Sequence, residues 1–313
     1  MKIMYIHGFG SSAESGTVKR LRELLPDAVV VADDVPLQPQ DAIAMLHEMA
    51  DRENPDIIIG TSMGGMYAEQ LHGYDRILVN PAFQIADTMK EHGMMGNQTY
   101  FNRRRDGVQQ FVVTNALVKD FRTISEQCFQ HPDPEHVWGL FGDRDPVVHT
   151  RSLFLEHYPR AIYFHGEHRL NEHTLINYIV PLIRRIDKAQ RGISDPIVLI
   201  DFSCLSDSHG NPASSMLKTY YQLIADYDVR ILAPSPSAHP EQTTSVMNWV
   251  EEHISAPAHD TVIFCNDTAI LMADYLITRN ATTDFMGSVV EFGSEGMKTW
   301  EDVATYFSRL GGQ

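Results

Sequence analysis

The sequence predicts an α/β protein built from two units, each with a mostly parallel sheet and helices on both faces. Short apolar segments of strand length alternate along the chain with segments in which apolar residues recur every three or four positions. Such alternation is typical of parallel sheets with crossover helices. The pattern runs twice, and 313 residues suffice for two domains of roughly 150 residues each.

The first half carries six predicted strands, and most of the gaps between them are helical. Strands are expected at residues 2–6, 28–32, 56–59, 76–79, 137–141 and 161–164. Helices are expected at 17–25, 39–51, 63–71, 152–158 and 170–186. The segment 84–131 is too long for one crossover and mixes aromatic with charged residues, so we predict an inserted small helical cap there.

A polar segment at 188–195, which contains Gly192 and precedes Pro196, has the composition of a domain linker. The first domain is then 1–187 and the second is 196–313. In the second domain, strands are expected at 197–201, 229–233, 261–265 and 289–292, and helices at 214–225, at 243–253 and from Thr299. The second domain is therefore also predicted to be α/β.

The net charge of −16 is concentrated in the second half, where residues 192–313 contain five basic and sixteen acidic side chains. Such a surface repels phosphate backbones, so we expect no nucleic-acid binding. An interaction with a protein partner, or with a second copy of the chain, through this acidic half is left open.

The apolar and cysteine patterns bear on the compartment. No apolar run approaches the ~20 residues that cross a membrane, and the chain reaches His7 too early for the apolar core of a secretory signal. The three cysteines have no Cys-x-x-Cys spacing, which predicts neither a disulfide framework nor a structural zinc site. We therefore expect a cytoplasmic protein with no membrane span, no metal and no other cofactor.

A Gly-x-Ser-x-Gly pattern at 60–64 places Ser62 between a predicted strand and the predicted helix from Met63. A serine on such a turn is lifted above the sheet, and the flanking glycines allow strand and helix to approach closely. Ser62 is therefore the candidate nucleophile. The alternative is a turn of small residues with no reaction.

A serine hydroxyl needs a base to take its proton and a carboxylate to orient that base. Both follow in chain order, because Asp145 comes after the strand at 137–141 and His168 after the strand at 161–164. The carboxyl ends of parallel strands share one edge, so these side chains can meet Ser62. Asp143 is the alternative acid, and Asp145 is favoured because Pro146 restricts its loop.

Two further histidines compete with His168 for the role of base. His165 is expected within the strand and His173 within the helix at 170–186. A core or surface position explains both of them better.

A tetrahedral intermediate of acyl transfer needs two backbone N–H donors. Met63, which follows the candidate nucleophile, is the candidate for one of them. Phe9, in the glycine-rich loop 7–12 after the first strand, is the candidate for the other. A phosphate-binding loop is the alternative for 7–12, but its spacing matches neither Gly-x-Gly-x-x-Gly nor the P-loop.

Residues 5–12, 60–65 and 79–82, together with the Asp145 and His168 loops, resemble the small bacterial α/β-hydrolase esterases of the YqiA type. The resemblance spans 1–187. It implies an α/β-hydrolase domain with Ser62 as nucleophile, His168 as base and Asp145 as orienting acid. It also implies substrates that are short to medium acyl esters or thioesters, so the sequence predicts a serine esterase or thioesterase.

Two groups in the cap are candidates for substrate contact. The arginines at 103–105 are candidates to bind an anionic group of the substrate, and a solvated basic face is the alternative. Met94, Met95 and Tyr100 are candidates to line an acyl pocket, or else to pack in the core.

The second half resembles the deoxyribonucleotidase branch of the haloacid dehalogenase (HAD) superfamily over residues 195–307. The segments that carry this resemblance are 201–205, 273–277, 292–295 and 299–303. It implies a Rossmann-like, HAD-like domain in which Asp201 stands at the place of the phosphoryl-accepting aspartate and Asp274 at that of a metal ligand.

The departures from that superfamily fall on its working residues. The replacements are Ser203 for the general acid, Ala233 for a hydroxyl, Thr268 for a lysine, and Thr278 and Arg279 for two acidic residues. Asp201 and Asp274 then form a degenerate site, because one or two carboxylates hold magnesium weakly. The second domain is therefore predicted to be non-catalytic and to serve structure, docking or ligand sensing.

The leading prediction is thus a serine hydrolase that cleaves esters or thioesters through an acyl-enzyme intermediate. A hydrolase fold that only binds a ligand, a peptidase or carbon–carbon bond hydrolase with the same residues, and a bifunctional hydrolase and phosphatase are the alternatives.

Overall fold

The computed structural model describes residues 1–235, 239–254, 262–281 and 283–310. The chain divides into two units, Met1–Ile183 and Arg184–Gln313, each with its own sheet. Within the described ranges, no helix combines the length and the apolar character that crossing a membrane requires.

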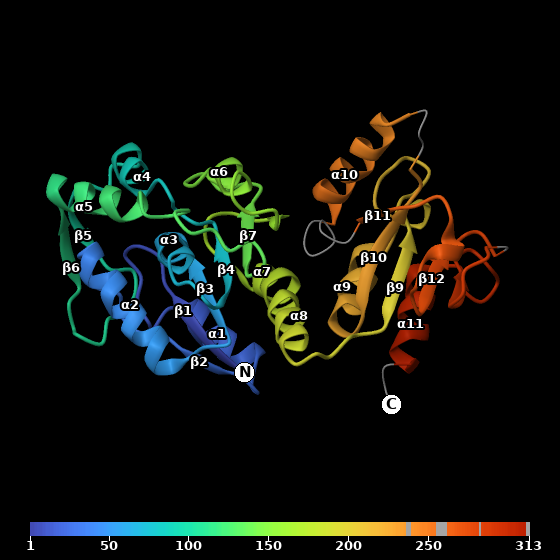
Figure 1. Ribbon diagram of the computed structural model, residues 1–313, viewed down its shortest axis with the longest axis horizontal. Helices are drawn as coiled ribbons and strands as arrows, with labels where there is room; N and C mark the ends of the chain where they lie inside the picture. The colour runs from blue at the N-terminus through green and yellow to red at the C-terminus, as the bar shows by residue number, and fades with distance from the viewer. Residues whose placement is uncertain (236–238, 255–261, 282, 311–313) are drawn as a thin grey trace. The chain divides into compact units, whose positions relative to one another are not determined.

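Six parallel strands form the sheet of the first unit in the order β2-β1-β3-β4-β7-β8 (Figure 1). They are β1 (Lys2–Ile6), β2 (Val29–Val31), β3 (Ile57–Thr61), β4 (Asp75–Val79), β7 (Val137–Gly142) and β8 (Ala161–Phe164). All six predicted strands are confirmed. Since β2 and β3 lie on opposite sides of β1, the connections after β1 and β3 leave in opposite directions, which creates a crevice at the carboxyl edge.

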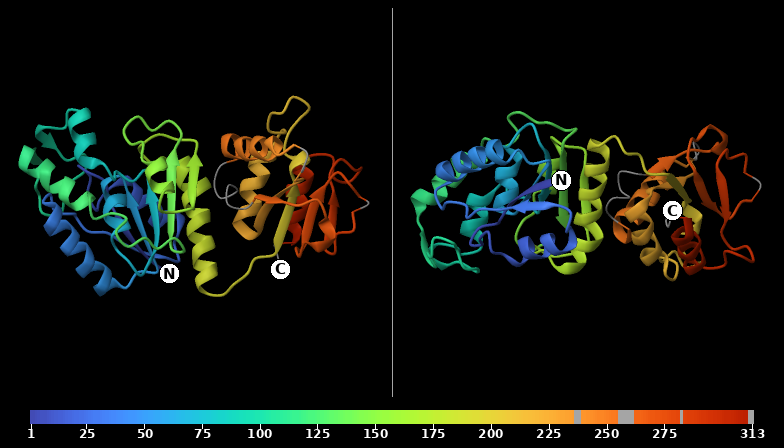
Figure 2. Two further views of the ribbon diagram at one scale, coloured as in Figure 1. Left: turned by 45° about the horizontal axis from the view of Figure 1, so that its top comes forward. Right: turned by 90° about the horizontal axis from the view of Figure 1, so that it is seen from below.

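Helices cover both faces of this sheet, with α1 on one side and α2 on the other (Figure 2). The helices of this layer are α1 (Gly16–Leu24), α2 (Pro39–Glu53), α3 (Met63–Glu69) and α6 (Arg151–Leu155). Helix α6 ends three residues earlier than predicted. Pro159 disfavours helical backbone at Tyr158, the last residue of the predicted helix.

The helix predicted at 170–186 differs in extent and in regularity. It is divided into α7 (Glu172–Thr174), a π-helical turn (Leu175–Ile179) and α8 (Val180–Gln190). The predicted linker 188–195 therefore begins three residues too early. Helix α8 is ended by Gly192, which adopts a φ of +67°, and the Ile193 N–H donates to the Lys188 carbonyl at 2.9 Å, an arrangement that favours glycine.

The segment predicted as a cap is inserted between β4 and β7, but it is not purely helical. It holds α4 (Ile85–Glu91), an antiparallel hairpin of β5 (Gly96–Thr99) and β6 (Gln110–Val113), and α5 (Asn115–Ser125). In β6, Phe111 and Val113 are buried whereas Val112 is exposed. The sequence does not show this alternation, because the exposed Val112 is apolar as well, and the run is too short to be recognised as a strand without its partner.

The second unit has a five-stranded parallel sheet in the order β11-β10-β9-β12-β13. Its strands are β9 (Ile197–Asp201), β10 (Asp228–Ala233), β11 (Val262–Phe264), β12 (Tyr275–Thr278) and β13 (Ser288–Glu291). Counted along the chain this order is 3-2-1-4-5, that of a doubly wound Rossmann-like sheet. Four strands match the prediction, although Thr261 of the predicted 261–265 strand lies outside the described residues.

The remaining strand of this sheet, β12, was not predicted. It spans only four residues and pairs with β9 on one side and β13 on the other. Three helices complete the unit: α9 (Met216–Asp226), α10 (Glu241–His253) and α11 (Trp300–Leu310). A four-residue strand carries too little pattern to be recognised without its neighbours.

Candidate active site

Ser62 stands on a sharp turn between β3 and α3. Its backbone φ is +57°, a value that non-glycine residues seldom adopt. A Cβ added at Gly60 would lie 2.2 Å from the carbonyl oxygen of Gly64, and one added at Gly64 would lie 2.1 Å from that of Ile6. Only glycine fits at either position, so the two glycines let the turn form and present the serine hydroxyl at the carboxyl edge of the sheet.

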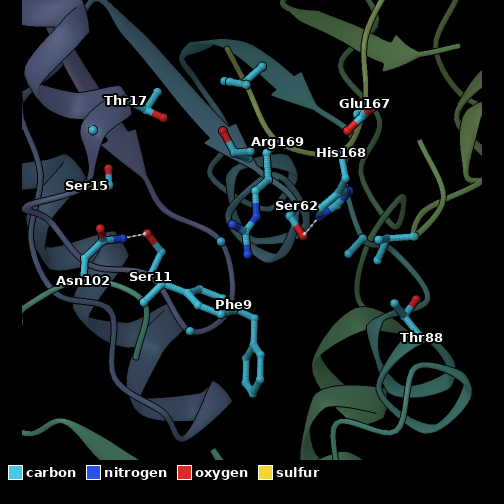
Figure 3. Close-up of a pocket in the computed structure, with 18 of the residues that line it drawn as sticks. Phe9, Ser11, Ser15, Thr17, Ser62, Thr88, Asn102, Glu167, His168 and Arg169 are labelled. Carbon is cyan, nitrogen blue, oxygen red and sulfur yellow. Dashed lines mark hydrogen bonds between the residues drawn. The ribbon is translucent and has the colours of Figure 1, made fainter. Parts of the chain in front are cut away.

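Three side chains from distant parts of the sequence meet at this edge (Figure 3 shows the contact between Ser62 and His168). The Nε2 atom of His168 lies 3.1 Å from the Oγ atom of Ser62, and its Nδ1 atom lies 2.8 Å from Oδ2 of Asp145. An ionised carboxylate only accepts, so Nδ1 carries the ring proton and donates it to Asp145. Nε2 is then the acceptor for the Ser62 hydroxyl.

The two candidate acids have different partners. Asp145 is 5% exposed, and its Oδ1 also accepts hydrogen bonds from the backbone N–H groups of Val147 at 2.7 Å and Val148 at 3.1 Å. Asp143 instead accepts from Nδ1 of His165 at 2.9 Å. The structure therefore joins Asp145, and not Asp143, to His168.

The two competing histidines lie apart from this group of three. His165 pairs with Asp143 and comes directly after β8 rather than within it. His173 belongs to α7, and its ring packs 6.0 Å from that of Tyr178.

The loop after β1 lies against the candidate nucleophile. A Cβ added at Gly8 would come within 3.2 Å of the Ser62 Cβ. Next to Gly8, the ring of Phe9 packs edge-on against that of Phe111 at 5.3 Å. Met63, which follows Ser62, is buried at the start of α3. Of the residues proposed from the sequence as backbone donors, Met63 thus adjoins Ser62 in the chain, and Phe9 belongs to the loop that packs against Ser62.

His7 holds this loop, a role that the sequence analysis did not assign. Its Nε2 accepts from the Val35 N–H at 3.0 Å, so Nδ1 carries the proton and donates to the Gly8 carbonyl at 2.9 Å. Burial lowers the pKa of His7, because the charged form loses its hydration. His7 is therefore held neutral, with both ring nitrogens engaged in positioning the loop.

Asn80 is a second residue whose role the sequence analysis missed. It is buried at the end of β4, and its Oδ1 accepts from the Gly142 N–H at 2.8 Å. Its Nδ2 lies 3.2 Å from the carbonyl oxygens of both Glu167 and His168. One amide thus joins the loops that follow β4, β7 and β8, and it fixes the backbone that carries His168. An asparagine directly after a buried strand was the available signal.

A cavity of about 850 Å³ opens beside Ser62 and His168. The cavity wall formed by α4 is mostly apolar, with Ile85 and Met89 beside Thr88. The rest of the cap contributes both apolar residues (Met94, Phe111) and polar ones (Gln98, Thr99, Asn102). The opposite wall of the cavity is polar and includes Ser15, Thr17, Arg20, Asn171 and Glu172. An apolar pocket with a few polar groups is the usual form of a small-molecule site.

Of the predicted pocket residues, Met94 lines this cavity. Met95 is exposed, and the Tyr100 ring packs 4.4 Å from that of Phe111.

The arginines at 103–105 are not among the residues that line the cavity. Arg104 is buried, pairs with Asp106 at 3.0 Å and lies over the ring of Tyr100. Arg105 pairs with Asp33 at 2.7 Å. The prediction that this arginine cluster binds the substrate is therefore not supported. Arg104 and Arg105 hold the cap through the chain's own carboxylates.

In the second unit, the predicted pair of Asp201 and Asp274 does not form a common site. Asp201 ends β9, whereas Asp274 comes before β12, and its Oδ2 accepts from the Ile197 N–H at the start of β9. The two carboxylates thus lie at opposite ends of the sheet. The prediction was wrong because the strand at Tyr275–Thr278 was not recognised, and residues before and after a strand lie at opposite edges.

Asp201 is surrounded instead by hydroxyl groups. Its Oδ1 accepts from Oγ of Ser203 at 2.8 Å, and its Oδ2 accepts from Oγ1 of Thr278 at 3.0 Å. Nε of Arg279 donates to the Ser203 carbonyl at 3.3 Å. Magnesium prefers several carboxylate and water ligands. One carboxylate with an arginine close by does not fit that ion.

In the first unit, strand β3 leads into a Gly-x-Ser-x-Gly turn, and an aspartate and a histidine follow in chain order at the ends of later strands. This arrangement defines the unit as an α/β hydrolase. The chain belongs to the uncharacterised protein family UPF0227, whose sequence profile matches residues 2–182.

Solved structures of similar fold include an α/β hydrolase, GrgF, from Penicillium sp. sh18. It is 14% identical, with a TM-score of 0.37, and the match covers 61% of this chain and 89% of that one. Tomato methylketone synthase I in complex with 2-tridecanone is 10% identical, with a TM-score of 0.41, over 62% of this chain and 98% of that one.

A curated relative is similar to a shorter part of the chain. This protein of Vibrio phage KVP40, named a putative 5'(3')-deoxyribonucleotidase, is 25% identical over 165 residues. The match covers 43% of this chain and 96% of the phage protein.

Proposed function

We propose that this chain is a serine hydrolase that cleaves carboxylic esters or thioesters through an acyl-enzyme intermediate. The observation that carries this proposal is the line of hydrogen bonds from Ser62 through His168 to Asp145 beside a cavity of about 850 Å³. A base within hydrogen-bond reach of a hydroxyl, itself oriented by a buried carboxylate, is the arrangement that activates a serine.

The proposed reaction begins when the Ser62 oxygen attacks the carbonyl carbon while its proton passes to Nε2 of His168. The carbonyl electron pair moves onto oxygen, and the backbone N–H groups of Met63 and Phe9 stabilise the resulting oxyanion. The intermediate collapses and expels the alcohol or thiol, which takes the proton from His168. Water then attacks the acyl-serine with His168 as base, so a carboxylic acid leaves and Ser62 regains its proton.

The other residues of the site preorganise these steps. Asp145 stabilises the positive charge that His168 carries after the first proton transfer. Asn80 fixes the backbone of the His168 loop, and His7 fixes the loop that carries Phe9. Displacement of a reacting group by about 1 Å can cost a hundredfold in rate, so these buried contacts support the proposed chemistry.

The test is labelling with a fluorophosphonate, which phosphonylates activated serines, followed by peptide mapping. We expect one adduct, on Ser62, together with turnover of ester or thioester substrates near neutral pH. The comparison set holds an ester, a thioester and a peptide with the same acyl group. A protein that binds acyl compounds but gains no adduct would support the ligand-binding alternative, and faster peptide cleavage would support the peptidase.

For the second unit we propose a non-catalytic role in structure, docking or ligand sensing. Both oxygens of the Asp201 carboxylate accept hydrogen bonds from Ser203 or Thr278, and the surrounding donor set does not fit magnesium. Phosphoryl transfer to a carboxylate needs metal or cationic stabilisation of the phosphate. The similarity to the phage protein leads us to propose a HAD-like fold for the second unit. The surroundings of Asp201 lead us to propose that this fold does not carry out the phosphatase reaction.

Phosphate release from deoxynucleoside monophosphates in the presence of magnesium tests this second proposal. We expect the intact chain to release no more phosphate than its Asp201→Asn variant. Magnesium-dependent release that the substitution abolishes would show a bifunctional hydrolase and phosphatase, and would overturn the non-catalytic role.

A further inference from the structure

Arg169 follows the proposed base His168, and its side chain extends into the cavity beside Ser62 (Figure 3). The guanidinium lies 4.8 Å from the centre of the Phe101 ring. That ring covers Gly10, where an added Cβ would come within 3.0 Å of it. Gly10 belongs to the same loop as Gly8, which lies against Ser62. The cation is thus held over the loop that borders the proposed nucleophile.

Arg169 differs from the other arginine of the cavity in its partners. Arg20 pairs with Glu23 at 2.6 Å and also with Glu172, so two carboxylates compensate its charge. Among the residues that the structure describes, Arg169 forms no ion pair, and it is exposed to the cavity. The carboxylate nearest to it in sequence, that of Glu167, lies on the other side of His168 (Figure 3). The positive charge at this point of the cavity is therefore not compensated.

The cavity has two sides of different character, with Ser62 between them. Figure 3 shows Ser15, Thr17 and the cap residue Asn102 on one side of Ser62 and Thr88, from α4 of the cap, on the other. On that side α4 also contributes the apolar side chains of Ile85 and Met89. The two halves of an ester extend in opposite directions from the carbonyl carbon. An acyl chain against α4 therefore directs the alcohol or thiol half toward the polar side, where Arg169 lies over Phe101, the neighbour of Asn102.

We propose that the substrate of this hydrolase carries an anionic group, a phosphate or a carboxylate, on its leaving alcohol or thiol, and that Arg169 binds it. This inference rests on the proposed function and specifies its substrate class. A planar guanidinium binds carboxylate and phosphate oxygens through two parallel N–H bonds. The guanidinium lies over the Phe101 ring, and among the described residues no carboxylate pairs with its N–H groups, so they are available to the anion.

The test compares four butyrate esters of substituted phenols, and monophenyl succinate as a fifth ester, in the wild type and in Arg169→Ala, Arg169→Lys and Arg103→Ala. The phenols carry a carboxylate, a phosphonate, a neutral methyl ester or no substituent. Arg103 is the matched control, because it is an exposed arginine of the cap that is not among the residues lining the cavity. Taking the ratio of kcat/KM between variant and wild type for each ester cancels the intrinsic reactivity of the phenol.

We expect Arg169→Ala to lower kcat/KM for the two anionic esters by about tenfold and for the two neutral esters by less than about twofold. Arg169→Lys keeps the positive charge but lacks the paired N–H groups of the guanidinium, so its kcat/KM for the anionic esters should lie between those of Arg169→Ala and the wild type. Arg103→Ala should match the wild type on all four esters. The larger loss of Arg169→Ala, on the carboxylate ester or on the phosphonate ester, identifies a carboxylate or a phosphate-like group as the preferred anion.

Two results would overturn this inference. Equal losses on neutral and anionic esters would show that Arg169 only supports the fold of the loop. A selective loss on monophenyl succinate, which carries its charge on the acyl half, would place the anion on the wrong side of the ester. Neither result touches the proposed hydrolysis itself, which fails separately if Ser62→Ala remains active on the unsubstituted phenyl ester.

Discussion

Replacing Ser62 with alanine should lower kcat for ester hydrolysis by roughly 10⁵- to 10⁶-fold, because no acyl-enzyme forms without its oxygen. The residual rate should come from substrate binding and the backbone N–H groups near the loop after β1, which stabilise the oxyanion of a direct attack by water. Alanine keeps a Cβ at the φ of +57°, so the strain of the turn changes little. The measurement is steady-state hydrolysis of a phenyl ester, with fluorophosphonate labelling as a second readout.

Ser152→Ala is the control for this variant, since it removes an exposed hydroxyl from α6. It should keep the wild-type rate and the adduct. Thermal unfolding should coincide for both variants and the wild type. Hydrolysis by Ser62→Ala at the wild-type rate would refute the assignment of the nucleophile.

The Asp145→Asn variant should lose about 10⁴-fold in kcat while its fold is retained. The amide has nearly the size of the carboxylate, and its oxygen can still accept from Val147 and Val148. Its NH₂ group, however, favours the His168 tautomer whose Nε2 carries the proton, and that tautomer cannot take the proton of Ser62. The charge that would stabilise protonated His168 is lost as well. The measurement is kcat for the same ester across neutral and mildly alkaline pH.

Asp143→Asn is the matched control, because Asp143 is close in sequence but pairs with His165. Its amide oxygen can still accept from the Gly166 N–H, so hydrolysis should stay within about threefold of the wild type. A large loss in Asp143→Asn together with a small loss in Asp145→Asn would reverse the assignment of the orienting acid.

Most of the first sheet was predictable because its signals are local. A buried parallel strand is a short apolar run in the sequence. The turn at Ser62 is recognisable because strand and helix approach so closely that only glycine fits at positions 60 and 64, and both glycines are visible in the sequence. The elements that escaped are those whose local signal is weak. Strand β12 has only four residues, and the strands of the cap hairpin are equally short and partly exposed. Whether such segments form strands is decided by pairing with neighbouring strands.

The sequence by itself determined the α/β class, the serine and the histidine, and it narrowed the aspartate to Asp143 or Asp145, since each of these residues follows a recognisable strand. Only the tertiary structure separated Asp145 from Asp143, moved Asp274 to the opposite edge from Asp201, and placed Arg169 rather than the arginines at 103–105 in the cavity. The physical reason is that a chain's order fixes which strand end a residue follows, whereas hydrogen bonds between different strand ends fix where its side chain points. Those bonds, such as the ones Asn80 makes to two other loops, join residues that are far apart in the sequence.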